Sequence, residues 1–285
     1  MNRKDSLFQV KSTLNIRGNL LSLERPLVMG ILNVTPDSFF EGSRVENEKS
    51  QLQKAERMLA QGASILDVGG YSSRPGAEHI SEDEERKRVS QAIGAIAREF
   101  PDAPISVDSF RASVAEAAID SGAAIINDIS GGSLDDQMFE TVARLKVPYI
   151  LMHMRGTPQN MVKQTQYEHL IEELFAYFAE KVGQLQPLGV SDIVLDPGFG
   201  FAKTKEQSYE VLRNLGYFKS LKLPLLAGLS RKSMIYKELG TSPEEALNGT
   251  SVLNTMALMN GASILSVHDV KPAVEAVKLY LATYT

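Results

Sequence analysis

The segment IVLDPGFGF (193–201) passes from an aliphatic run through an aspartate into a glycine-rich turn. Seven further segments have the same form, with polar or charged residues directly after a short apolar run. They are LVMGILNVTPDSF (27–39), ILDVGGYSSRPGA (65–77), ISVDSF (105–110), IINDIS (125–130), YILMHMRGTPQ (149–159), LLAGLSRKS (225–233) and ILSVHD (264–269). Such runs are typical of strands buried on both faces. Polar residues at every carboxyl end are typical of the active-site face of a (β/α)₈ barrel.

Helical periodicity occupies the segments between these runs. From Tyr167 to Leu185, apolar residues recur every three or four positions, which predicts one face of a long amphipathic helix. Ser81 followed by Glu84 resembles a capping box, and Ser242-Pro243 predicts another helix start. Helices are expected to end at three glycines: Gly62, Gly122 and Gly261. About eight strand and helix pairs favour a closed α/β barrel with parallel strands, and an open doubly wound sheet is the alternative.

The first 25 residues are predicted to form an extension to the barrel. The runs 13–16 and 20–23 flank Arg17-Gly18-Asn19, which is a β-hairpin signal. A hairpin ahead of the first barrel strand is expected to cover the barrel floor. We therefore divide the chain into an N-terminal hairpin extension, residues 1–25, and a barrel domain, residues 26–285.

Composition limits the partners and the compartment. The 285 residues are 43% hydrophobic and 23% charged, with a net charge of −5, so no broad basic surface for nucleic acid is expected. The absence of cysteine excludes disulfides and thiolate chemistry, and it fits a reducing compartment. No signal-peptide pattern and no apolar stretch of membrane-spanning length occurs. We expect a cytoplasmic protein that acts on small molecules away from membranes.

Four aspartates lie in or at the ends of the aliphatic runs: Asp67, Asp108, Asp128 and Asp196. A carboxylate buried among such neighbours is costly unless it is hydrogen-bonded, so some of them should face a polar pocket or a ligand. We expect this of Asp108 and Asp196, whereas capping of the next helix fits Asp128 and Asp67 nearly as well. Together with Asn127, these carboxylates suit a flat heterocycle that carries N–H donors and ring nitrogens.

Candidate cations follow several strands. Arg74 follows the second run, Arg231 and Lys232 follow the seventh, and His268 follows the eighth. Barrels often hold a phosphate at the loops after the last two strands, so an anionic substrate group is expected, although each cation alone is also compatible with a surface charge. A desolvated Lys232 also permits a Schiff-base mechanism, but it lies two residues beyond Ser230, in the loop rather than on the strand.

Four other features bear on the site. Asn33 is a candidate single ligand for Mg²⁺, which takes its other oxygens from water and phosphates. His153, between two methionines, is predicted to be packed rather than catalytic. The turn from Gly198 to Phe201 is not a dinucleotide fingerprint, but its aromatic rings can wall one side of a flat ligand. The long loops 35–47 and 69–81 are candidate lids.

At these residues the chain resembles the dihydropteroate synthases, the folate-pathway enzymes of the pterin-binding (β/α)₈ family. The resemblance runs from about Pro26 to the C-terminus. It rests on four ordered motifs, NVTPDSF (33–39), SRPG (73–76), DPGFGF (196–201) and SRKS (230–233). It implies the condensation of 6-hydroxymethyl-7,8-dihydropterin pyrophosphate with p-aminobenzoate to dihydropteroate and pyrophosphate. It also implies Mg²⁺, a homodimer formed through the late barrel helices, and a p-aminobenzoate site that sulfonamides target.

The same resemblance assigns residues to roles. The pterin ring is expected to lie against Asp108, Asn127, Asp196 and Lys232, of which Asp108, Asp196 and Lys232 are the expected catalytic groups. Arg231 and His268 are expected to contact the anion and to stack on the ring. Asn33 is expected to contact Mg²⁺ and pyrophosphate. Thr35 and Phe39 belong to a loop expected to close over the site. The expected p-aminobenzoate residues are Ser73, Arg74, Pro75, Phe201 and Ser233.

The resemblance also implies how the reaction proceeds. The C–O bond to pyrophosphate breaks first and leaves a pterin methylene cation, which the neighbouring carboxylates stabilise. Mg²⁺ and cationic side chains stabilise the departing anion. Little acid–base chemistry is needed, which agrees with the absence of an obvious catalytic dyad.

One residue departs from the family pattern. The last strand of the family carries arginine two residues before the histidine, where this chain has Ser266. Serine offers one neutral donor in place of a charged fork, and losing a charge-assisted contact costs about 1.5 to 3 kcal/mol. Arg74 or Lys203 is a candidate substitute. The alternative is a pterin-binding protein with weak or no synthase activity. Ser73, where threonine is common, keeps the hydroxyl.

Overall fold

Eight parallel strands form a closed ring in the computed structural model, which describes residues 10–34, 44–72 and 79–284. The strands are β3 (Leu27–Asn33), β4 (Ile65–Gly69), β5 (Ile105–Asp108), β6 (Ile125–Asp128), β7 (Tyr149–Met152), β8 (Ile193–Asp196), β9 (Leu226–Ala227) and β10 (Ile264–Val267). The hydrogen-bonded order runs from β8 back to β3 and on to β10 and β9, and a parallel bridge from Leu195 to Leu225 joins the two ends. The predicted barrel is confirmed, and the open sheet is wrong.

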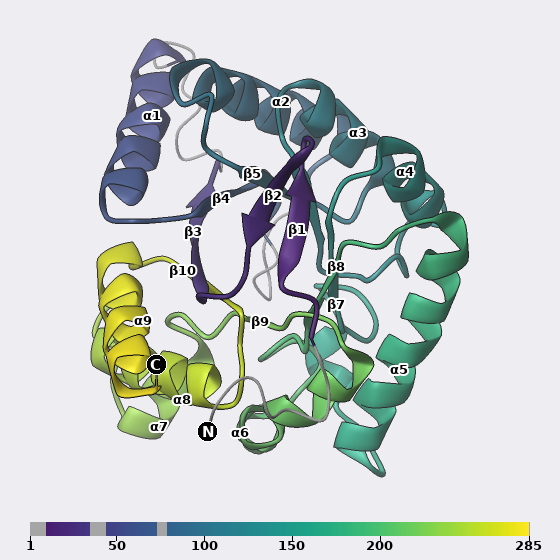
Figure 1. The fold of residues 1–285 in the computed structure, drawn as a ribbon, viewed down its shortest axis with the longest axis vertical. Helices are drawn as coiled ribbons and strands as arrows, with labels where there is room; N and C mark the ends of the chain where they lie inside the picture. Colours follow the sequence, from purple (N-terminus) through teal and green to yellow (C-terminus); the bar gives the residue numbers. More distant parts are fainter. Residues whose placement is uncertain (1–9, 35–43, 73–78, 285) are drawn as a thin grey trace.

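Helices surround this ring (Figure 1). They are α1 (Arg44–Ala60), α2 (Glu82–Glu99), α3 (Ala112–Asp120), α4 (Met138–Leu145), α5 (Leu170–Leu185), α6 (Lys205–Arg213), α7 (Ser233–Leu239), α8 (Leu247–Met259) and α9 (Val270–Tyr284). Short 3₁₀ turns cover Met161–Lys163, Gln186–Leu188 and Leu215–Leu221. Among the helices described, none is long and apolar enough to cross a membrane.

The three predicted helix ends are confirmed, and of the two predicted helix starts one is confirmed and one is wrong. The Ser81 hydroxyl accepts a hydrogen bond from the Glu84 amide and caps α2, and the three expected glycines have positive φ. The predicted start at Ser242-Pro243 is wrong, because α8 begins at Leu247. The carbonyl oxygens of Pro243 and Glu244 instead accept hydrogen bonds from the Arg231 guanidinium, at 2.7 and 2.6 Å.

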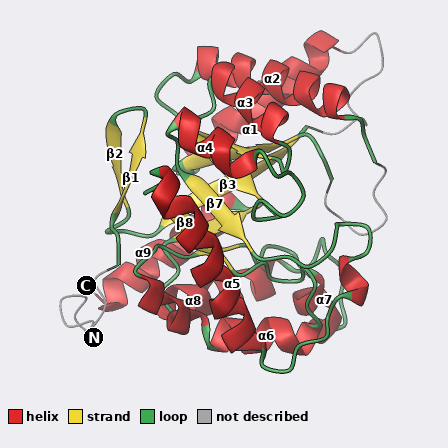
Figure 2. Ribbon diagram, turned by 90° about the vertical axis from the view of Figure 1, so that its right-hand side faces the viewer, coloured by secondary structure: helices red, strands yellow, loops and turns green. Residues whose placement is uncertain are grey.

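The N-terminal hairpin closes the barrel floor, as predicted. Strands β1 (Thr13–Ile16) and β2 (Asn19–Ser22) pair antiparallel through a turn in which Arg17 and Gly18 both have positive φ. Leu14, Ile16 and Leu23 pack against the first inward-facing side chains of the barrel strands. That layer contains Met29, Ile65, Ile125, Ile150, Val194, Leu226 and Ile264. Figure 2 shows the hairpin at one end of the strands, so a ligand is expected at the other end.

Candidate active site

Polar side chains from β3 and β5 converge at the open mouth of the barrel. Gly69, the last residue of β4, pairs with Asn33 on one side and Asp108 on the other. A methyl group placed on Gly69 would lie 3.4 Å from Asp108 Oδ2 and 3.5 Å from Asn33 Oδ1. The glycine thus keeps open the space toward which these two oxygens point.

The opposite side of the mouth is organised in the same way around Gly228, one residue beyond β9. A methyl group on Gly228 would lie 3.7 Å from Lys232 Nζ, 3.9 Å from Ser266 Cβ and 4.0 Å from Asp196 Oδ2. The ends of β8, β9 and β10 therefore bring a carboxylate, an ammonium group and Ser266 together. The predicted pair of Asp196 and Lys232 does share one site.

Lys232 lies between this carboxylate and the turn after β8. Its Nζ donates a hydrogen bond to the Phe199 carbonyl oxygen at 2.6 Å, and it lies 4.9 Å from the centre of the Phe201 ring. Burial lowers the pKa of Lys232 to about 8, and the charge of Asp196 offsets part of that effect. An ammonium group that titrates so near neutrality can lose its proton under mild conditions.

The carboxylates at the mouth have raised pKa values. Burial raises the pKa of Asp108 well above its usual range, and the charges of Asp67, Glu85, Asp128 and Asp196 raise it further. Burial also raises the pKa of Asp196, against the lowering effects of Lys232, the Gly198 amide and Lys203. Because a ligand with N–H donors or a developing positive charge stabilises the ionised carboxylates, these groups favour such ligands.

Asp128 and Asp67 have different partners. Asp128 accepts hydrogen bonds from the amides of Ser130 and Gly132 and from the hydroxyls of Ser130 and Tyr149, so it closes the turn after β6. Asp67 caps no helix, because Ser81 is the N-cap of α2. Its Oδ2 accepts a hydrogen bond from Asn127 Nδ2 at 2.9 Å, and burial raises its pKa to about 6.

Two of the candidate cations have occupied donors. Arg231 pairs with Asp269 through Nε and Nη2, at 2.7 and 3.0 Å, and its Nη1 donates to the two carbonyl groups ahead of α8. Lys203 Nζ lies 2.9 Å from His153 Nδ1 and donates to the Gly198 and Phe201 carbonyl oxygens. Lys203 therefore braces the turn after β8, and its ammonium group already has three partners there.

The histidines also have defined contacts. His153 is 2% exposed and stands edge-on to the Tyr177 ring, with ring centres 4.8 Å apart, so the prediction of a packed histidine is confirmed. Burial and the charge of Lys203 hold its pKa well below the usual range. His268 is half-buried after β10, and its amide and Nδ1 both lie 3.1 Å from the Ser230 hydroxyl oxygen.

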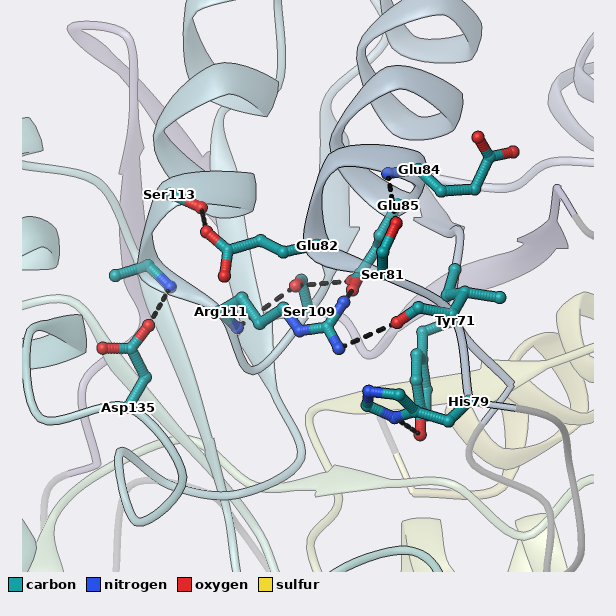
Figure 3. Close-up of polar contacts among 12 residues, drawn as sticks. Tyr71, His79, Ser81, Glu82, Glu84, Glu85, Ser109, Arg111, Ser113 and Asp135 are labelled. Carbon is teal, nitrogen blue, oxygen red and sulfur yellow. Dashed lines mark hydrogen bonds and ion pairs between the residues drawn. The ribbon is translucent and has the colours of Figure 1, made fainter.

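A buried ion pair behind the mouth was not predicted from the sequence. Glu85, fully buried on α2, binds Arg111 Nη1 at 2.7 Å and accepts a hydrogen bond from the Ser109 hydroxyl, also at 2.7 Å. Arg111 also donates to the Ile80 carbonyl oxygen and lies over the Tyr71 ring. Figure 3 shows these side chains pointing toward one another. The pair anchors the residue after Asp108. Glu85 was not singled out because it lies in the charged run EDEERKR (82–88), which has the composition of a solvent-exposed helix face.

Other predicted site residues are only partly described. Thr35, Phe39, Ser73, Arg74 and Pro75 lie outside the described residues. Ser233 is the exposed first residue of α7. Among the residues that the structure does describe, no group of three or more histidine, aspartate or glutamate side chains could hold a metal ion. A metal at this mouth would therefore need oxygens from its ligand.

Comparisons with known proteins agree with the geometry. Residues 29–268 match the family described as pterin binding enzyme. A dihydropteroate synthase from Synechocystis is 44% identical over 90% of this chain and 89% of its own length. A Yersinia pestis dihydropteroate synthase, solved in a sulfonamide drug complex, superposes with a TM-score of 0.89 at 41% identity, covering 95% of this chain and 98% of the other. A Xanthomonas albilineans dihydropteroate synthase with 4-aminobenzoic acid gives 0.88 at 35% identity, covering 96% and 98%.

Proposed function

The chain belongs to the pterin-binding enzyme family, and from that membership we propose that it catalyses the dihydropteroate synthase reaction of folate biosynthesis. This transferase joins 6-hydroxymethyl-7,8-dihydropterin pyrophosphate to p-aminobenzoate and releases pyrophosphate. The observation that carries the proposal is the convergence of Asp196, Lys232 and the Gly228 gap at the barrel mouth. We also propose that the protein is cytoplasmic, because a sequence without cysteine fits a reducing compartment.

The side chains of this chain perform two tasks in that reaction. The carboxylates of Asp108 and Asp196 and the amide of Asn127 bind the N–H groups of the pterin ring, which fixes the methylene carbon at the mouth. When the C–O bond to pyrophosphate breaks, positive charge develops on the pterin, and the same carboxylates stabilise it. Since desolvation strengthens such interactions, the buried position of Asp196 increases the effect.

Mg²⁺ is proposed as the cofactor, with Asn33 as its protein ligand. Asn33 Oδ1 and Asp108 Oδ2 face the same gap above Gly69, and these are the hard oxygen donors that Mg²⁺ prefers. When bound, the ion would neutralise charge on the leaving pyrophosphate. Asn33 would fix where that ion sits relative to the pterin.

The test of this function is p-aminobenzoate-dependent release of pyrophosphate by the purified protein with Mg²⁺, run beside Ser266→Arg. We expect the native chain to turn over. The arginine should change kcat/KM by less than about tenfold, or 1.4 kcal/mol, because Asp196 lies within reach and would pair with it. The comparisons give no support to the alternative of a protein without synthase activity. No pyrophosphate release from either protein would contradict the proposed function.

Filling the Gly228 gap should weaken pterin binding without unfolding the protein. All neighbours of an added methyl group lie at 3.7 Å or beyond, which is ordinary contact distance. We expect Gly228→Ala to raise the KM for the dihydropterin substrate by about tenfold, since the methyl group occupies the space between Lys232 and Asp196. Gly183→Ala, on α5 with open space around it, is the control and should leave the KM unchanged. A native KM for Gly228→Ala would show that the ring does not enter this gap.

We propose a homodimer formed through α8 and α9. Val252, Met256 and Met259 are exposed on one face of α8, and Leu279 on the adjacent α9 is 71% exposed. Apolar residues grouped in this way are typical of an interaction surface. Light scattering should give twice the 31.3 kDa chain mass, and Met256→Glu should shift the protein toward the monomer. A native protein that stays monomeric at micromolar concentration would contradict the proposal.

A further inference from the structure

Asp67 is a buried carboxylate that the proposed reaction does not use directly. It is 4% exposed and lies inside the barrel on β4, two residues before Gly69 at the mouth. Across the sheet it pairs in register with Ile31 on one side and Ser106 on the other. Within the described part of the chain, Asp67 Oδ1 and the Ser106 hydroxyl form no hydrogen bond of regular geometry, but the neighbouring Ser106 hydroxyl still lowers the pKa of Asp67. Its Oδ2 accepts a well-formed hydrogen bond from Asn127 Nδ2.

The chemistry of this bond sets the orientation of the Asn127 amide. An ionised carboxylate has no proton to donate, so the asparagine must turn its NH₂ group toward Asp67. The observed bond, from Asn127 Nδ2 to Asp67 Oδ2 at 2.9 Å, has this direction. Asn127 Oδ1 is then left on the other side of the amide, and it accepts no hydrogen bond from the described residues.

The consequence for the pocket is a row of acceptors. Asp108 and Asn127 pair in register on β5 and β6, and Asp196 ends β8 across the mouth. With Asn127 Oδ1 facing the pocket, each of the three side chains turns an oxygen toward a ligand, and one N–H of the Asn127 amide is held by Asp67. The reversed amide would place a donor in the middle of the row, opposite an N–H group of the ring.

We propose that Asp67 is a positioning residue that holds the Asn127 amide with its oxygen toward the pocket, and so selects ligands whose edge carries N–H donors. This inference rests on the proposed function, because it concerns how the same site recognises the dihydropterin ring. Asp67 acts through Asn127 and does not itself contact the ligand.

Two substitutions separate orientation from charge. Asp67→Leu removes the acceptor, so the Asn127 NH₂ group would be buried without a partner and would turn toward the pocket. Asp67→Asn keeps an oxygen for Asn127, and its own NH₂ group would face the Ser106 hydroxyl. By calorimetry with 6-hydroxymethyl-7,8-dihydropterin, we expect Asp67→Leu to lose at least tenfold in affinity and Asp67→Asn to stay within threefold. The KM for p-aminobenzoate should change little in both.

Controls distinguish this role from a general packing effect. Ser106→Ala removes a hydroxyl beside Asp67 but keeps the carboxylate oxygen that accepts from Asn127, so it should bind the dihydropterin as the native protein does. Native affinity in Asp67→Leu would overturn the proposal. An equal loss in Asp67→Leu and Asp67→Asn would also overturn it, because the negative charge would then matter rather than the accepting oxygen.

A readout without ligand keeps this inference separate from the proposed function. The side-chain amide protons of Asn127 can be assigned by NMR as the resonances that disappear in Asn127→Asp. They should shift in Asp67→Leu and remain near their native positions in Asp67→Asn. Failure of the native protein to bind the dihydropterin would contradict the proposed function alone, whereas an unchanged Asn127 resonance in Asp67→Leu would contradict the positioning role.

Discussion

The Asp196→Asn variant is expected to lose at least a hundredfold in kcat/KM for the dihydropterin substrate, or about 2.7 kcal/mol of transition-state stabilisation. Asp196 Oδ1 accepts a hydrogen bond from the Gly198 amide at 2.8 Å, so the asparagine oxygen would take that position. Its NH₂ group would then replace Oδ2, the atom that faces the Gly228 gap near Lys232. The pocket would lose a negative charge and gain a donor where the pterin needs an acceptor.

Steady-state kinetics and thermal unfolding together test this prediction. The unfolding midpoint should fall little, because asparagine fills the same space. Asp192→Asn is the matched control, since Asp192 lies before β8 at the opposite end of the strand and pairs with Lys11 at the surface. The control should keep native kinetics. A loss below tenfold in Asp196→Asn would show that this carboxylate does not carry the developing charge.

Lys232 should impose a basic limb on the pH profile of kcat/KM, with an apparent pKa of about 8. Burial lowers the pKa of the group, so the ammonium form predominates below pH 8 and is lost above it. The neutral amine would lose its attraction to Asp196 and to the Phe201 ring. Activity should therefore fall as the pH rises through 8.

Lys232→Met should lose about a hundredfold in kcat/KM at pH 7, where the native lysine is charged, and should show no basic limb near pH 8. Lys237→Met, one turn further along α7 and exposed, is the control and should keep both the rate and the limb. The assignment would fail if the limb near pH 8 persisted in Lys232→Met, because another group would then be titrating.

The strands and their polar ends were predictable because the signal is local. A strand buried on both faces is a run of adjacent apolar residues, and the side chain that ends it follows directly in the chain. All eight predicted runs contain a barrel strand. Helix starts were less predictable. The carbonyl groups at Pro243 and Glu244 bind an arginine from another loop, and the sequence around them carries no sign of it.

The roles of the buried charges were not predictable in the same way. Asp67 and Asp128 occupy similar positions in the sequence, yet one binds Asn127 and the other closes a turn. The sequence suggested that Lys203 could bind an anion. In the structure its Nζ contacts His153 Nδ1 and donates to two carbonyl oxygens. In each case the deciding partner is a side chain or carbonyl group that the sequence pattern does not single out.

By itself, the sequence determined the barrel, its floor hairpin and the set of polar residues at the strand ends, because each depends on residues adjacent in the chain. Only the tertiary structure decided which carboxylates face the pocket, which cations are already paired, and how the Asn127 amide is oriented. Packing of successive strand and helix units brings residues separated by 26 to 60 positions within hydrogen-bond distance, as for Glu85 with Arg111 and Asp67 with Asn127. Burial and partner, rather than residue type, then set the role of each charge.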